Sequence, residues 1–274
     1  MIDLHTHTTA SDGRCTPLEL VTGAVAAGVR VLAVTDHDTV AACEAAAAAC
    51  AAAQIEFVPG IEITAVYEHD DVHVLGYFLD VASPDLHAFL SEQRRHRIDR
   101  VRRMVQRLAT LGIALDAEDI VRPALDDPSR SAGRPWIARA LVAAGHAASS
   151  DEAFERWLAR GRPAFVPRLG ASPVDVIAGI HAARGVASLA HPGLNKSDEP
   201  ISALVAAGLD AVEAYHSDHD AETTDRYLAL AARLGIAVSG GSDFHGDGSH
   251  GPAAPGAVSL PREAFETLRR LAAG

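Results

Sequence analysis

The sequence has few cysteines, few aromatic residues and no long hydrophobic run. Its three cysteines, Cys15, Cys43 and Cys50, are an odd number without C-x-x-C spacing, which argues against a disulfide framework and against a zinc knuckle. No apolar stretch is long enough to cross a bilayer, and the first residues lack the basic and apolar regions of an export signal. We therefore expect a cytoplasmic protein with no membrane partner, and the sequence indicates no protein partner.

The composition predicts a globular protein whose charge is unevenly distributed. With 274 residues, 48% of them hydrophobic, the chain can form one large domain or one domain with an insertion. The formal net charge is −12, yet the stretch from Asp85 to Arg168 holds 15 arginines against 11 acidic residues. A local arginine cluster can hold a phosphate even in an acidic protein.

Seven short apolar runs predict strands, most of which alternate with predicted helices. The capping-box pair of Thr16 and Glu19 starts the first helix, and Gly28 ends it. This alternation predicts a parallel α/β barrel, because a doubly wound sheet would need a topological switch and a glycine fingerprint that the sequence lacks. The predicted strands cover residues 1–4, 29–34, 55–63, 72–77, 185–189, 209–214 and 236–239.

The alternation is interrupted after Ser83 and Pro84. Residues 86–111 predict one long amphipathic helix, shorter helices follow at 135–144 and 151–159, and the next strand-like stretch is 164–167. We therefore predict a small all-helical domain, residues 85–163, inserted into a barrel domain formed by residues 1–84 and 164–274.

Two histidines, His5 and His7, follow the first predicted strand. Their i, i+2 spacing places both imidazoles on one face of a strand, where each offers a lone pair to a divalent ion. His-x-His also occurs by chance on solvated edges, so this motif alone leaves both interpretations open.

The rest of the chain repeats the arrangement, since polar groups follow or lie within most predicted strands. In α/β barrels such groups gather at the carboxyl ends of the strands. A set without thiolates suits two or three divalent ions such as Mn, Fe or Zn, and a carboxylate such as Glu62 can bridge two of them. The nine candidate ligands are His5, His7, Asp12, His37, Glu62, His73, His191, Asp243 and His245.

These motifs resemble the PHP (polymerase and histidinol phosphatase) family of amidohydrolase-like, metal-dependent phosphoesterases. The resemblance rests on His5-Thr6-His7, Thr35-Asp36-His37, Gly60-Ile61-Glu62, His73, Ala190-His191-Pro192 and Ser242-Asp243-Phe244-His245. It implies a distorted (β/α)7 TIM-like barrel, with manganese as the first choice of metal and Fe2+ or Zn2+ as alternatives. It also implies three ions: one held by His5, His7, Glu62 and Asp243, a second by Glu62, His73 and His191, and a third by Asp12, His37 and His245. It further implies catalytic roles for Asp243, His191 and His219.

The stretch Ser129–Arg139 narrows the range of expected substrates. It places guanidinium and hydroxyl groups at the start of a predicted helix, where they can bind a phosphate. It resembles the PHP subgroup that includes 3',5'-nucleotide bisphosphate phosphatases and 5'-to-3' exoribonucleases. That resemblance implies substrate contacts by Ser129, Arg130, Arg134, Asn195 and His219. Alternatively, Arg130 and Arg134 form surface salt bridges with Asp126 and Asp127.

Our leading hypothesis is a phosphatase that removes the 3'-phosphate from nucleoside 3',5'-bisphosphates. The alternatives are a nuclease that trims 5'-phosphorylated RNA or DNA, a histidinol-phosphate phosphatase and a non-catalytic metal-binding module. His216 and His219 could donate a proton to the leaving group or serve as structural hydrogen-bond partners. The arginines between Arg94 and Arg107 could follow an RNA strand, although the interleaved acidic residues favour a solvated helix face.

Overall fold

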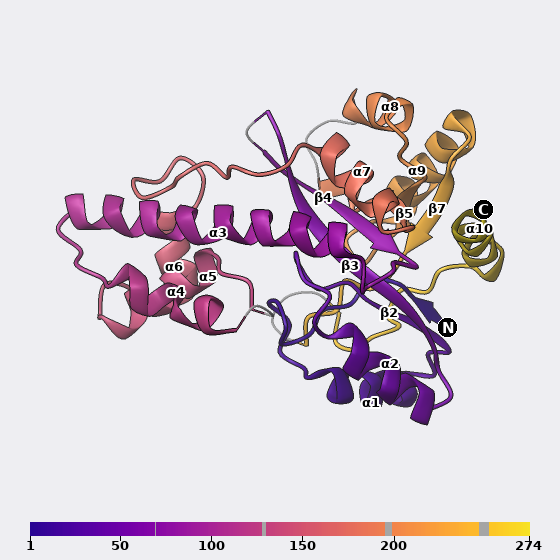
Figure 1. Ribbon diagram of the computed structural model, residues 1–274, viewed down its shortest axis with the longest axis horizontal. Coiled ribbons are helices and arrows are strands. Elements are labelled where there is room, and N and C mark those ends of the chain that lie inside the picture. The colour runs from indigo at the N-terminus through magenta and orange to yellow at the C-terminus, as the bar shows by residue number, and fades with distance from the viewer. Residues whose placement is uncertain (69, 128–129, 195–198, 247–251) are drawn as a thin grey trace.

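The computed structural model describes residues 1–68, 70–127, 130–194, 199–246 and 252–274 (Figure 1). Its centre is a seven-stranded sheet in which the strands follow one another in chain order. The strands are β1 (Ile2–Asp3), β2 (Val31–Val34), β3 (Glu56–Tyr67), β4 (Asp70–Tyr77), β5 (Val186–Leu189), β6 (Ala211–Tyr215) and β7 (Ala237–Gly240).

The sheet closes into a barrel through the segments that follow β1 and β7. The backbone N–H of Asp243 donates to the carbonyl of His5 at 2.8 Å, and the N–H of His7 donates to the carbonyl of Phe244 at 2.9 Å. A parallel bridge joins Thr6 to Phe244 between these two hydrogen bonds. The barrel predicted from the sequence is therefore confirmed, and the two ends of the chain contribute adjacent parts of its wall.

The prediction of an all-parallel sheet is wrong at β4, which runs antiparallel to both β3 and β5. Only residues 68–69 separate β3 from β4, whereas a parallel pair needs a crossover connection of about a dozen residues or more. Glu68 adopts a left-handed backbone with φ of 56° in this short connection. The reversed strand is the distortion that separates this barrel from a regular (β/α) barrel.

Helices cover the outside of the barrel, with α1 and α2 on one side and α7, α8 and α9 on another (Figure 1). The capping box of Thr16 and Glu19 is present, and Gly28 ends the first helix with φ of 79°. These helices are α1 (Pro17–Ala27), α2 (Cys43–Ala52), α7 (Pro173–Ala182), α8 (Glu199–Ala206), α9 (Ala221–Leu234) and α10 (Arg262–Ala273), and η2 (Pro192–Leu194) is a 3₁₀ turn.

A helical extension lies beside the barrel between β4 and α7 (Figure 1). It has its own buried cluster, to which Met104, Leu108, Ile137, Leu141 and Leu158 belong. The boundaries proposed for it from the sequence stay a prediction. Its elements are α3 (Pro84–Thr110), α4 (Ala117–Asp126), α5 (Arg134–Ala143), α6 (Ser150–Ala153) and the π-helix η1 (Phe154–Leu158).

The strand-like stretch at residues 164–167 does not form a strand and pairs with none. Its carbonyl groups are instead satisfied by side chains of α3: Arg100 donates to Val166 at 2.9 Å, and Arg107 donates to Phe165. Pro163 and Pro167 lack backbone N–H donors and disfavour strand pairing. Within the described residues, no helix combines the length and the apolar character needed to span a membrane.

The wall and the interior of the barrel are chemically different. Apolar residues such as Ile61, Ile63 and Val212 are fully buried under the covering helices. Polar side chains are also buried, which is unusual unless they are hydrogen-bonded or bind an ion. These fully or almost fully buried polar residues include Asp3, His5, His7, Asp36, Glu62 and Glu213.

Candidate metal centre

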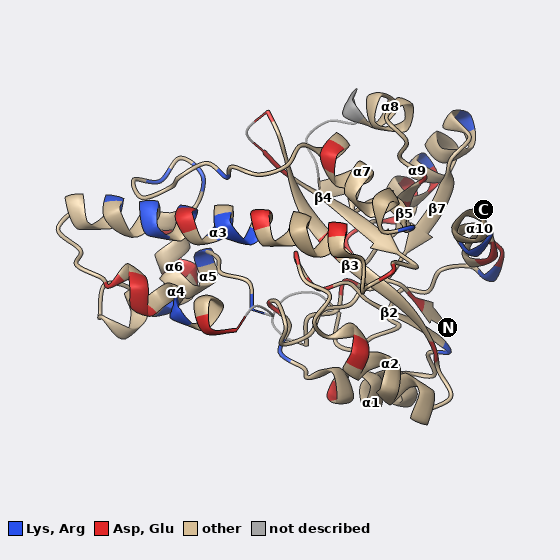
Figure 2. Cartoon of the chain, in the orientation of Figure 1, with Lys and Arg blue, Asp and Glu red and all other residues tan. Residues whose placement is uncertain are grey.

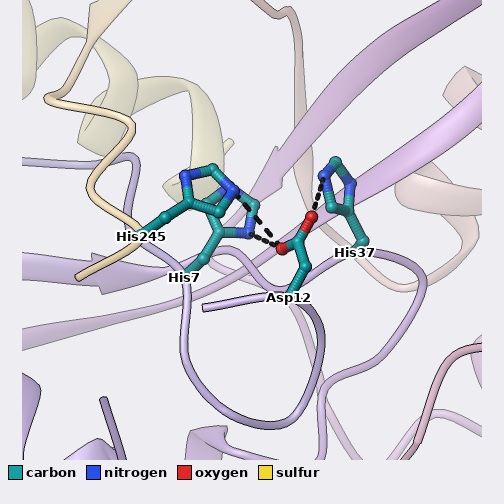
Figure 3. Close-up of side chains that lie close together, drawn as sticks. All are labelled: His7, Asp12, His37 and His245. Carbon is teal, nitrogen blue, oxygen red and sulfur yellow. Dashed lines mark ion pairs between the residues drawn. The ribbon is translucent and has the colours of Figure 1, made fainter. Parts of the chain in front are cut away.

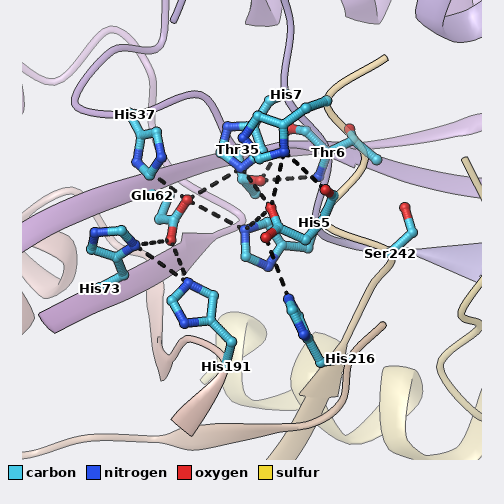
Figure 4. A network of polar contacts seen from close by, with 12 residues as sticks. His5, Thr6, His7, Thr35, His37, Glu62, His73, His191, His216 and Ser242 are labelled. Atoms are coloured by element: carbon cyan, nitrogen blue, oxygen red, sulfur yellow. Dashed lines mark hydrogen bonds and ion pairs between the residues drawn. The ribbon is translucent and has the colours of Figure 1, made fainter. Parts of the chain in front are cut away.

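All nine predicted ligands lie together at one end of the barrel, which we call the mouth (Figure 4 shows the larger group around Glu62). Most of them follow strands, as the sequence predicts. Glu62 and His73 instead lie inside β3 and β4, because both strands extend beyond the other strands at the mouth. His191 and Asp243 have positive φ angles of 26° and 55°, a rare backbone conformation that recurs at functional sites.

Glu62 is the centre of the cluster, and each of its two oxygens faces a different set of imidazoles. Its Oε2 lies 3.3 Å from Nε2 of His5, 3.2 Å from Nε2 of His7 and 3.2 Å from Nδ1 of His37. A carboxylate in this arrangement can bridge two ions, because each of its oxygens can bind a different ion.

The other oxygen of Glu62, Oε1, faces the opposite side of the cluster. It lies 2.7 Å from Nδ1 of His73 and 3.1 Å from Nε2 of His191, and these two nitrogens are 3.3 Å apart. The resemblance implied this set of three residues for one ion, and the structure brings the three together.

Asp243 completes the group around Oε2 of Glu62. Its Oδ1 lies 3.3 Å from Nε2 of His5 and 3.1 Å from Nε2 of His7. Ligand atoms of these four residues all lie within 4.8 Å of one another, close enough to surround one ion.

Asp12 organises the remaining ligands at the outer edge of the cluster (Figure 3). Its Oδ1 is 3.3 Å from Nε2 of His245 and 3.7 Å from Nδ1 of His7, and its Oδ2 is 3.5 Å from Nε2 of His37. The predicted set of Asp12, His37 and His245 is therefore assembled, with His7 beside it.

The buried carboxylates and imidazoles of the cluster shift one another's pKa values. Burial by itself would lower the pKa of His7, but the carboxylates of Asp243 and Glu62 beside its Nε2 outweigh burial and raise that pKa to about 10. Burial lowers the pKa of His37 to about 4. Burial opposes ionisation of Glu62, yet the surrounding histidines, His37 and His73 foremost, hold its pKa well below the usual range.

The donor set fits divalent metal ions. Nitrogen and oxygen donors without thiolates suit Mn, Fe or Zn. Several of the buried ring and carboxylate atoms also form no hydrogen bond with the described part of the chain, although such groups normally find a partner. These atoms are Nδ1 and Nε2 of His7, Nδ1 of His37, Nδ1 of His191, Nε2 of His216 and Oδ1 of Asp243.

The sequence analysis missed Glu213, which supports the ligands from behind. Its Oε1 lies 2.9 Å from Nδ1 of His5, and its Oε2 accepts a hydrogen bond from the backbone N–H of His191 at 2.7 Å. A carboxylate behind a ligating histidine fixes the tautomer and the ring orientation. The available signal was a glutamate in the middle of the otherwise apolar strand Ala211–Tyr215.

Two further buried carboxylates hold the loops that carry ligands. Asp3 accepts hydrogen bonds from the backbone and the hydroxyl of Ser242, at 2.8 and 2.6 Å, beside Asp243. Asp36 accepts hydrogen bonds from the backbone and the hydroxyl of Thr8 at 2.7 and 2.6 Å, and from the hydroxyl of Ser11, next to Asp12.

The histidines after β6 have different surroundings. Nε2 of His216 lies 3.4 Å from Oδ2 of Asp243, which places this buried ring at the metal cluster. Both nitrogens of His219 contact the backbone: Nδ1 lies 2.9 Å from the carbonyl of Ala214, and Nε2 accepts from the N–H of Gly193 at 3.1 Å. The predicted catalytic and substrate contacts of His219 stay predictions.

Two cavities that share lining residues adjoin the cluster. The larger has a volume of about 1020 Å³ and extends from Asp243 and His245 to Arg130 on the helical extension. The smaller has a volume of about 200 Å³. It contains Arg134 together with three arginines that the sequence analysis did not place beside the metal cluster, Arg97, Arg100 and Arg168. The predicted contacts Ser129 and Asn195 lie outside the described residues.

A closed barrel of this kind with a histidine and carboxylate cluster at its mouth defines a metal-dependent hydrolase. The model of the PHP domain family matches residues 3–146, and the chain belongs to this family. The resemblance found from the motifs is therefore confirmed, and the chain is a metal-dependent phosphoesterase.

Relatives within the family differ in their named substrates. The chain is 35% identical to a 3',5'-nucleoside bisphosphate phosphatase of Chromobacterium violaceum, with 91% of this chain and 89% of the relative covered. It is 36% identical to the 5'-3' exoribonuclease Rnm of Salmonella typhimurium, over 89% of this chain and 84% of that protein. A structure from Bifidobacterium adolescentis, assigned as a metal-dependent phosphoesterase, is 33% identical, with a TM-score of 0.85 over 98% of this chain and 95% of that chain.

Proposed function

We propose that the protein hydrolyses the 3'-phosphate of nucleoside 3',5'-bisphosphates, such as adenosine 3',5'-bisphosphate, to give the nucleoside 5'-monophosphate and phosphate. The observation that carries this proposal is the small arginine-lined cavity directly beside the metal cluster, with His37 and His73 in its wall. A substrate with one phosphate at the cluster can place a second phosphate in this cavity. Histidinol phosphate has a single phosphate and would leave the arginines without an anion.

The charge balance of the small cavity favours an anion. Arg97 is paired with Asp38, and Nε of Arg168 lies 3.2 Å from Oδ1 of Asp71. Burial and the nearby arginines lower the pKa of Arg100 to about 9, so its guanidinium stays charged at neutral pH. The four arginines outnumber the three nearby aspartates, Asp12, Asp38 and Asp71, so a phosphate would add negative charge that the cavity lacks. Guanidinium groups bind phosphate with two parallel hydrogen bonds.

We assign the ions to the three ligand sets described above, with His5, His7, Glu62 and Asp243 around the first. His73 and His191 join Glu62 for the second, and Asp12, His37 and His245 form the third. Manganese is the first choice, with Fe2+ or Zn2+ as alternatives. Such ions lower the pKa of water and neutralise the charge on the phosphoryl oxygens.

Side chains of the protein would position the phosphate and donate the proton that the leaving group needs. Asp243 and His191 orient the reacting phosphate from opposite sides of Glu62, and Glu213 keeps His5 and His191 in position. The alkoxide that leaves needs a proton, and His219 is our candidate for donating it. In the present arrangement both of its nitrogens contact the backbone, so donation requires one of these contacts to open.

A 5'-to-3' exoribonuclease is the second candidate, because the cavity of about 1020 Å³ has room for more than a single nucleotide. Along α3, however, the acidic residues Glu92 and Asp99 interrupt the basic residues (Figure 2), which favours a solvated helix face over a continuous path for an RNA backbone.

The deciding experiment compares initial rates of the manganese-loaded protein on adenosine 3',5'-bisphosphate and on a short 5'-phosphorylated RNA at matched concentrations. Phosphate and AMP from the first compound, with the RNA left largely intact, would support the proposal. Stepwise release of mononucleotides from the RNA at equal or greater efficiency would overturn it in favour of the nuclease.

A further inference from the structure

The wall of the large cavity opposite the metal cluster is built by the helical extension. Asp12, His37, Asp243 and His245 line one side of this cavity. The other side contains two half-buried aromatic residues, Trp136 near the start of α5 and Phe154 at the start of η1. Phe154 also lines the small arginine cavity, so this residue borders both cavities.

Both aromatic rings are already stacked with arginines. The guanidinium of Arg130 lies 5.7 Å from the ring centre of Trp136, and that of Arg134 lies 5.7 Å from the ring centre of Phe154. Flat cationic groups over aromatic faces form layers to which another flat ring can add. Ser131 lines the same cavity, and its buried hydroxyl has no hydrogen-bond partner among the described residues.

The backbone at Phe154 is irregular in a way that favours a functional position. A π-helix begins there, and the N–H of Ala159 donates to the carbonyl of Phe154 at 2.9 Å. Single π-turns are rare in proteins overall, but a large share of them occur at functional sites. Such a turn changes the direction in which the side chain leaves the helix.

We propose that Trp136 and Phe154 form a stacking site for the nucleobase of the substrate. This inference rests on the proposed function and adds the part of the substrate that neither the metal cluster nor the arginine cavity recognises. A flat, uncharged ring gains from stacking on aromatic and guanidinium planes irrespective of its hydrogen-bonding edge. The site therefore selects for the presence of a base and accepts purines and pyrimidines alike.

Trp157 provides an internal control for this inference. It packs partly against the same helical core as Trp136 and Phe154, and Arg156 lies 5.2 Å from its ring centre. Unlike these two residues, Trp157 is absent from the walls of both described cavities. A role in core packing should be common to both tryptophans, whereas a role in base binding should belong to Trp136 alone.

The first test compares kcat/KM for adenosine 3',5'-bisphosphate with that for 1,4-anhydro-D-ribitol 3,5-bisphosphate, which has no base. The wild type should prefer the nucleotide by about 10- to 100-fold, the range for one stacked base. Trp136→Leu should bring this ratio close to one, Trp136→Phe should retain part of it, and Trp157→Leu should leave it unchanged. Equal rates of the wild type on both compounds, or an unchanged ratio in Trp136→Leu, would overturn the proposal.

The second test does not depend on turnover, because the chain has only two tryptophans. Trp157→Leu leaves Trp136 as the sole tryptophan, and Trp136→Leu leaves Trp157. AMP should quench the fluorescence of the manganese-loaded Trp157→Leu variant and should not quench that of Trp136→Leu, while ribose 5-phosphate should quench neither. If the first test shows no phosphate release but AMP quenches only the Trp157→Leu variant, the proposed reaction is rejected and the base site is retained. Equal quenching in both variants, or none, would reject the base site.

Discussion

The carboxylate of Glu213 lies 2.9 Å from Nδ1 of His5, and both side chains are fully buried. The opposite nitrogen of the ring, Nε2, faces Glu62 and Asp243. The pair therefore fixes the orientation of the imidazole, with Nε2 directed into the cluster. Glu213 belongs to β6 and His5 follows β1, so the contact crosses the interior of the barrel.

We expect Glu213→Gln to weaken manganese binding by about 10- to 100-fold, which is typical when such a supporting carboxylate is lost. Metal affinity would be measured by competition with a fluorescent chelator. The control is Asp210→Asn. Oδ2 of Asp210 lies 2.8 Å from Nε2 of His181, so this variant removes another carboxylate–histidine pair, one that lies away from the metal cluster. If both variants bind manganese like the wild type, Glu213 does not position His5.

Glu62→Ala should abolish metal loading and turnover together, because each oxygen of Glu62 faces a separate group of imidazoles. Metal content after dialysis and the rate on adenosine 3',5'-bisphosphate are the two measurements. Glu56→Ala is the matched control, since Glu56 begins the same strand and pairs with Arg269 outside the cluster. Retention of full activity by Glu62→Ala would rule out a shared carboxylate.

Arg134→Ala should raise KM for a nucleoside bisphosphate about tenfold or more while changing KM for an aryl phosphate little, because only the bisphosphate carries a second anion. Steady-state kinetics on both substrates test this expectation. Arg122→Ala removes an arginine of the same extension that pairs with Asp119 at the surface, and it should change neither value. Equal increases for both substrates in Arg134→Ala would remove the specificity role of this arginine.

Manganese binding should release protons and tighten as the pH rises from about 6.5 to 8.5. The pKa of His7 is about 10 in the metal-free protein, so this ring carries a proton at neutral pH and must lose it to bind a metal. Each proton released strengthens the apparent affinity up to about tenfold per pH unit below that pKa. Calorimetry in two buffers with different ionisation enthalpies would count the protons, and pH-independent binding without proton release would contradict the expectation.

The sequence predicted most of what depends on local patterns. The capping box of Thr16 and Glu19 and the αL glycine at position 28 determine the first helix by short-range hydrogen bonds, and these are visible in a linear pattern. The nine candidate ligands were brought together in the prediction for a similar reason, because the strand-end rule needs only the order of strands and polar residues.

What the sequence did not predict depends on contacts between distant residues. Glu213 differs from an ordinary strand residue only because β6 faces the inside of the barrel, and Arg97, Arg100 and Arg168 meet only after the return segment packs on α3. The direction of β4 was mispredicted because the neighbouring strand pairs that do not include β4 are all parallel, so the prediction extended the same direction to β4.

The reversed direction of β4 determines how the helical extension is attached. Because β4 runs away from the mouth, α3 begins near its far end and then extends for about 40 Å, given a rise of 1.5 Å for each of its 27 residues. Its first half packs in the barrel core through Leu86 and Leu90, and its second half packs in the core of the extension through Met104 and Leu108. One added or deleted residue between these halves would rotate the extension by about 100° relative to the barrel. Functional members with this architecture should therefore tolerate length changes in the connections between helices but not within α3.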